Sequence, residues 1–148
     1  MNVRSWGFTL IELIAVMILL GILSVALFSR LDSVRVSAVQ SGRDDLIAAL
    51  FFAQQTAMAR TGQNRVIRLQ ISAGQISVTE NVIGTGASTK IIYSIAMPRG
   101  ATLTPAVILS YDKLGRTTPQ NIMVTGSGNS AGVTASVRLE GSGYAFAN

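Results

Sequence analysis

Residues 7–28 read GFTLIELIAVMILLGILSVALF and contain a single charged side chain, that of Glu12. A helix rises about 1.5 Å per residue, so residues 8–28 would extend over roughly 30 Å, the thickness of the hydrocarbon core of a bilayer. Beyond Phe28 the composition becomes mixed and polar. The sequence therefore predicts a hydrophobic N-terminal helix over residues 8–29, followed by one modest globular domain.

Glu12 does not fit a plain membrane anchor. A carboxylate in the hydrocarbon region costs about 2.5–3.5 kcal/mol on insertion scales, and an anchor gains nothing from it. A secretory signal peptide would need an Ala-x-Ala-like cleavage site after the apolar run, and residues 27–32, Leu-Phe-Ser-Arg-Leu-Asp, offer none. We therefore expect Glu12 to have a cationic partner.

Residues 7–13, Gly-Phe-Thr-Leu-Ile-Glu-Leu, resemble the processing motif of type IV prepilins and type II secretion pseudopilins. The resemblance implies that residues 1–7 are a leader, which a prepilin peptidase removes between Gly7 and Phe8 before Phe8 is N-methylated. It also implies that Glu12 acts in assembly by pairing with the N-terminal amine of a neighbouring subunit. The implied location is the bacterial inner membrane, single-pass with a periplasmic head over 30–148, and then a pilus or pseudopilus.

An amphipathic helix is predicted over residues 34–61. Apolar residues recur there at spacings that place them on one helix face. The centre of this face is formed by Val39, Leu46, Leu50, Ala53 and Ala57, and it is widened by Ile47, Phe51 and Met58. Arg60 and Gly62 suit the end of the helix. The two predicted segments would then form one long helix, whose C-terminal half packs into the head.

Strand-like segments follow between residues 65 and 146. Residues 66–71 and 75–80 flank the turn Ser72-Ala73-Gly74 and predict a β-hairpin. Further strands are predicted at 90–95, 107–111, 122–124 and 133–140. We expect an α+β, pilin-like fold, in which a C-terminal antiparallel β-sheet head packs against the long N-terminal α-helix.

The second half of the chain resembles a subgroup, the GspH/FimT-type minor pilins and pseudopilins, and within it the MSHA-type minor pilins. The resemblance rests on the order of the strands, on an aromatic-x-x-x-Gly-Arg turn from Tyr111 to Arg116, and on a final strand that ends in glycine.

No enzyme chemistry is expected from this composition. The chain has no Cys and no His, which excludes catalytic thiols, disulfides and His-ligated metals. Asp44 and Asp45 are adjacent, so on a helix they point about 100° apart and form no acid/base pair. The sequence predicts no catalytic residue, no metal ligand and no cofactor.

Three functions fit these features. The first is a minor pilin-like structural subunit of a type IV pilus, and the second a GspH-like pseudopilin of a type II secretion system. The expected partners are the prepilin peptidase, other pilin or pseudopilin subunits and, before assembly, the inner membrane. The third is a FimT-like DNA-binding minor pilin. Residues 140–148 contain no Lys or Arg, and Arg138 alone is no cluster of cations, so we do not expect a nucleic-acid partner.

Overall fold

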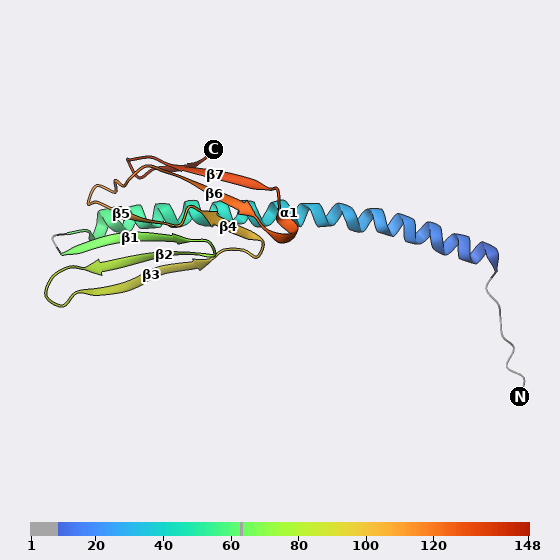
Figure 1. Ribbon diagram of the computed structural model, residues 1–148, viewed down its shortest axis with the longest axis horizontal. Coiled ribbons are helices and arrows are strands. Elements are labelled where there is room, and N and C mark those ends of the chain that lie inside the picture. Colours follow the sequence, from blue (N-terminus) through green and yellow to red (C-terminus); the bar gives the residue numbers. More distant parts are fainter. Residues whose placement is uncertain (1–8, 63) are drawn as a thin grey trace, which may run out of the picture. The chain divides into compact units, whose positions relative to one another are not determined.

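The computed structural model describes residues 9–62 and 64–148, with side chains at all of these positions except 26–35 and 129. The fold is α+β (Figure 1). It comprises the helix α1 (Leu10–Arg60) and the strands β1 (Arg65–Ser72), β2 (Gln75–Val82), β3 (Ser88–Ala96), β4 (Ala101–Thr104), β5 (Val107–Tyr111), β6 (Gln120–Gly126), β7 (Thr134–Leu139) and β8 (Ala145–Ala147), with a short 3-10 helix, η1 (Gly128–Ser130). The chain divides into two compact units, residues 1–34 and 35–148.

The first unit contains the N-terminal part of α1. The described side chains of residues 9–25 are all exposed. No helix in the described part of the chain is long and apolar enough to cross a membrane. The transmembrane segment predicted over 8–29 lies partly outside the described residues, which omit Phe8 and the side chains of 26–29. The proposed leader, residues 1–7, lies wholly outside them.

In the second unit, the C-terminal part of α1 buries the face that its periodicity predicts. Val39, Leu46, Leu50, Ala53 and Ala57 are all buried. The helix ends at Arg60, close to the predicted end, and Thr61 donates a last helical hydrogen bond from its N–H to the carbonyl of Ala57, at 2.9 Å. The assignment of Met58 to this face was wrong, because its side chain is 48% exposed.

The first sheet has the strand order β3-β2-β1-β5, and all of its strands are antiparallel to their neighbours. The predicted hairpin is confirmed as β1 and β2, with Ile67 opposite Glu80 and Ile71 opposite Ile76. Side chains of β1 alternate, so that Ile67, Leu69 and Ile71 are buried while those between them are exposed or half-buried. One face of this sheet therefore contributes to the core.

Four of the strands after β3 form a second antiparallel sheet with the order β4-β6-β7-β8, while β5 returns to the first sheet beside β1. The expectation of a single sheet was therefore wrong. After β3 the chain passes through Met97-Pro98-Arg99-Gly100, where Gly100 has a φ of +88° that favours glycine. The next strand, β4, then pairs with β6 instead of β3. The core joins α1 to both sheets through buried residues such as Leu50, Leu69 and Val124.

Candidate functional site

The residues predicted to act in processing and assembly lie at the N-terminus. Gly7 and Phe8 are outside the described residues. Glu12 lies in the first turn of α1 and is exposed, and its carboxylate accepts a hydrogen bond of 3.4 Å from the Thr9 hydroxyl. The partial positive charge of a helix N-terminus stabilises an acid there. Among the described side chains, no cation pairs with Glu12.

Large apolar side chains surround the first turns of α1. Their exposed fractions run from 43% at Val16 to 77% at Ile11, and they extend as far as Val25. The hydroxyl of Ser24 donates a hydrogen bond of 2.7 Å to the Leu20 carbonyl, so this polar group is satisfied within the helix itself. This surface is apolar on every side of the helix, and Glu12 is its one charge.

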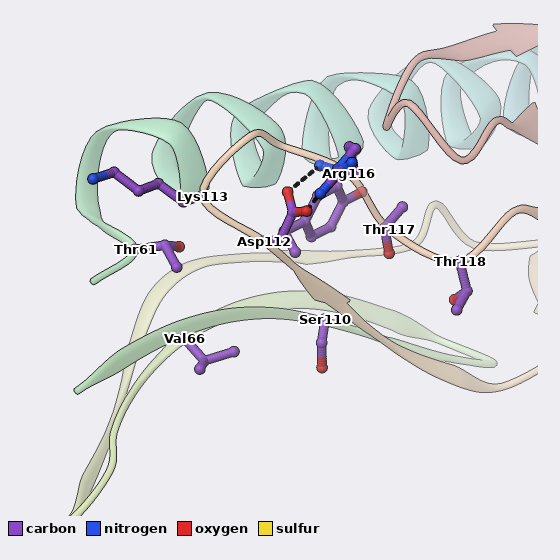
Figure 2. A pocket seen from close by; sticks show the side chains of 9 residues that line it. Thr61, Val66, Ser110, Asp112, Lys113, Arg116, Thr117 and Thr118 are labelled. Atoms are coloured by element: carbon purple, nitrogen blue, oxygen red, sulfur yellow. Dashed lines mark hydrogen bonds and ion pairs between the residues drawn. The ribbon is translucent and has the colours of Figure 1, made fainter. Parts of the chain in front are cut away.

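A second candidate site lies in the head, at the turn that follows β5. Asp112 organises this turn (Figure 2). Its Oδ1 accepts hydrogen bonds from the backbone N–H groups of Leu114, at 2.9 Å, and Arg116, at 2.8 Å, and its Oδ2 accepts one from Arg116 Nε at 2.8 Å. The backbone and side-chain hydrogen bonds from Arg116 hold the pKa of Asp112 below its ordinary value.

Two glycines, one in this turn and one in the turn between β7 and β8, approach Gln54 of α1 closely. Gly115 has a φ of +74°, and a Cβ built on it would lie 2.8 Å from Gln54 Cγ. Gly143 has a φ of +84°, and a Cβ there would lie 2.8 Å from Gln54 Nε2. Gln54 Nε2 in turn donates a hydrogen bond of 3.0 Å to the Ser142 carbonyl. The turn from Tyr111 to Arg116 is thus hydrogen-bonded internally and packs directly against the helix.

Beside the turn is a hollow of about 510 Å³ (Figure 2). We call it the β5 hollow. It is lined by Thr61, Val66, Ser110, Tyr111, Asp112, Lys113, Arg116, Thr117 and Thr118. In the described part of the chain, three buried side-chain oxygens lack a hydrogen-bond partner: Thr61 Oγ1, Tyr111 OH and Thr117 Oγ1. All three belong to residues that line this hollow.

Tyr111 keeps its proton over the physiological pH range. Its side chain is 2% exposed, and burial raises the pKa of Tyr111 well above its ordinary value. Its hydroxyl can therefore both donate and accept a hydrogen bond. Sequence reasoning identified the turn from Tyr111 to Arg116 but not the hollow.

Other charged groups of the head form structural pairs. Glu80 is 8% exposed and accepts a hydrogen bond of 3.1 Å from Arg65 Nη1, and Arg60 Nη1 lies 3.6 Å from its second oxygen. This cluster ties the end of α1 to the hairpin. Arg138 Nε lies 2.8 Å from Glu140 Oε1, so its charge is already compensated. No group of acidic side chains in the described ranges could hold a metal ion.

No family model, curated protein or solved structure matches this chain.

Proposed function

We propose that the chain is a minor pilin-like structural subunit, which enters or primes a type IV filament through its N-terminal helix. In this proposal the α+β fold is a pilin fold, with the residues after 34 forming its head. The precursor is held in the bacterial inner membrane with its head in the periplasm. A prepilin peptidase cuts between Gly7 and Phe8, and Phe8 is then methylated.

The observation that carries the proposal is the apolar surface of α1 between Leu10 and Val25. Each large apolar side chain gains about 1.5–3 kcal/mol on full burial, so a helix exposing such residues on all sides requires another apolar environment. A bilayer provides this before assembly, and a bundle of identical helices provides it afterwards. The internal hydrogen bond of Ser24 supports this reading, because it leaves no unpaired hydroxyl for hydrocarbon to surround.

In this proposal Glu12 fixes the longitudinal register between the N-terminal helices of neighbouring subunits. The resemblance to pilins assigns it the N-terminal amine of Phe8 in a neighbouring subunit as its partner. In a bundle of apolar helices the effective dielectric constant is far below that of water, so the attraction between the two charges is correspondingly stronger. Since Glu12 is the one charge in its segment, only one longitudinal offset between neighbouring helices satisfies it.

The experiment is incorporation of Glu12→Gln into filaments in a host with its own prepilin peptidase. We expect the variant to be cleaved normally and to be depleted from the sheared filament fraction, because glutamine keeps the shape but lacks the charge. Glu140→Gln is the matched control, since it makes the same carboxylate-to-amide change at a residue of the head. Incorporation of Glu12→Gln at the wild-type level would refute the pairing. Loss of cleavage would instead assign Glu12 to recognition by the peptidase.

A further inference from the structure

The first sheet ends in a long free edge at β3. The edge strands of the two sheets are β3, β5, β4 and β8 (Figure 1). Three of them are short, with five residues in β5, four in β4 and three in β8, whereas β3 has nine. A short edge strand is one way in which proteins avoid pairing with another chain, because a long one offers a row of unpaired N–H and C=O groups. Length therefore singles out β3.

The outer side of β3 is open. Among the described residues, the backbone of β3 pairs only with that of β2. Every side chain of β3 is exposed or half-buried, so no other described segment covers the strand. Alternate residues of a strand direct their N–H and C=O groups away from their antiparallel neighbour. These groups of β3 are therefore available to a further strand.

A groove of about 340 Å³ lies between β3 and α1. It is lined by Phe52, Thr56 and Arg60 of α1 and by Lys90, Ile91 and Ile92 of β3. Two of these side chains are large and apolar yet open to solvent, since Phe52 is 36% exposed and Ile91 is 62% exposed. Side chains of a strand alternate between the two faces of its sheet. A strand added beside β3 would thus direct alternate side chains towards this groove.

The groove carries an excess of positive charge. Glu80 is the only acidic residue between Leu46 and Tyr111 in the sequence. Its two oxygens already have cationic partners, since Arg65 Nη1 lies 3.1 Å from one and Arg60 Nη1 lies 3.6 Å from the other. Lys90 is opposite Glu80 in the strand register but makes no ion pair with any described side chain. Its charge therefore favours a carboxylate on whatever binds here.

We propose that β3 is a docking edge for an extended, acidic segment of another protein, which joins the first sheet as an additional strand. Hydrogen bonds between the two backbones supply affinity, and the groove selects the side chains: an apolar one over Phe52 and an acidic one beside Lys90. A second copy of β3 fits less well, because residues 88–96 contain no acid and would leave Lys90 uncompensated. The inference uses only residues of the head, so it can fail without the filament proposal.

The test uses the full-length chain in a mild detergent and two capped, fluorescent heptapeptides, with detergent alone as the blank. The first peptide, Thr-Glu-Thr-Val-Thr-Val-Thr, has its acid and its two apolar side chains on one strand face, and lysine replaces glutamate in the second. We expect anisotropy titrations to show about fivefold tighter binding of the glutamate peptide, because the exchange turns an exposed attraction into a repulsion. Equal affinities, or no binding of the glutamate peptide, would overturn the proposal.

Charge reversal at Lys90 locates the site. The chain has two lysines, Lys90 and Lys113, and both are exposed. Lys90→Glu should reverse the preference, so that the lysine peptide binds more tightly than the glutamate peptide. Lys113→Glu changes the net charge by the same amount and should leave the preference as it is. The same change in both variants would mean non-specific attraction and would overturn the proposal.

N-methylation of the peptide separates strand addition from binding by side chains alone. Since a strand pairs with its neighbour through alternate residues, methylating the amides of odd or of even residues blocks opposite edges of the glutamate peptide. We expect one of these two peptides to lose binding and the other to retain it. Loss by both or retention by both would show that no strand is added.

A nitroxide on Ser94→Cys tests the second copy as the rival occupant. The chain has no cysteine, so the label is unique, and Ser94 is an exposed residue of β3. The control is Thr134→Cys, at an exposed residue of β7. We expect the glutamate peptide to immobilise the label at Ser94 only. Dipolar broadening at Ser94 alone, without peptide, would assign the edge to a second copy and overturn the proposal.

Discussion

Replacing Gly115 by alanine tests the close packing of the turn after β5 against α1. The φ of +74° costs a residue with a Cβ about 1–2 kcal/mol. The new Cβ would lie 2.8 Å from Gln54 Cγ and 3.1 Å from Met58 Cγ, and overpacking of this kind costs about 1–3 kcal/mol more. Gln54 cannot move away freely, because its Nε2 is bonded to the Ser142 carbonyl. We therefore expect Gly115→Ala to destabilise the head by about 2–5 kcal/mol in total.

The control is Gly86→Ala. Gly86 also has a positive φ, +88°, but nothing lies within 4 Å of a Cβ built there, so alanine bears the backbone cost alone, about 1–2 kcal/mol. For a domain of this size 1 kcal/mol corresponds to about 4 °C in Tm. Thermal unfolding followed by circular dichroism should thus show a clearly larger loss for Gly115→Ala. In a Gln54→Ala background the excess should shrink. Equal losses for the two glycine variants would refute the packing argument.

Two further predictions concern the core and the turn. Leu50→Asp places an unpaired charge on the buried face of α1 and should unfold the head. Its control, Ala48→Asp, lies on the exposed face of the same helix and should shift Tm only slightly. Similar Tm shifts for the two variants would mean that the buried face is wrongly assigned. The pKa of Asp112 is lower in the folded chain than its ordinary value of 3.8, so its contribution to stability is present above that value and is lost as the pH falls through the lower folded pKa. Asp112→Asn should therefore flatten the acid limb of the Tm–pH profile, and an unchanged limb would contradict this assignment.

Much of the fold follows from local pattern. The spacing of Leu46, Leu50, Ala53 and Ala57 predicts the buried helix face, and the alternation in β1 and β2 predicts the hairpin. Pairing between distant strands is different, because alternation tells which side of a strand is buried but not which strand lies beside it. The division into two sheets, and the short strands β4 and β8, therefore could not be predicted.

The β5 hollow was inaccessible to sequence reasoning for a related reason. Thr61 lies about fifty residues before Tyr111 and Thr117, which flank one turn, and an unsatisfied hydroxyl depends on the orientation of its neighbours in three dimensions. Met58 illustrates the same limit on a smaller scale. Its helical position suits the buried stripe, yet it lies near the end of the helix beside the turn at Gly115, and its side chain remains about half exposed.

The most direct test of the filament proposal is intact-mass and N-terminal mass spectrometry of the chain recovered from sheared filaments. The host must supply its own prepilin peptidase. We predict a chain that has lost residues 1–7 and begins with N-methylated Phe8. An intact Met1, cleavage near Ser29, or complete absence of the chain from the filament fraction and from the filament base would contradict the proposal.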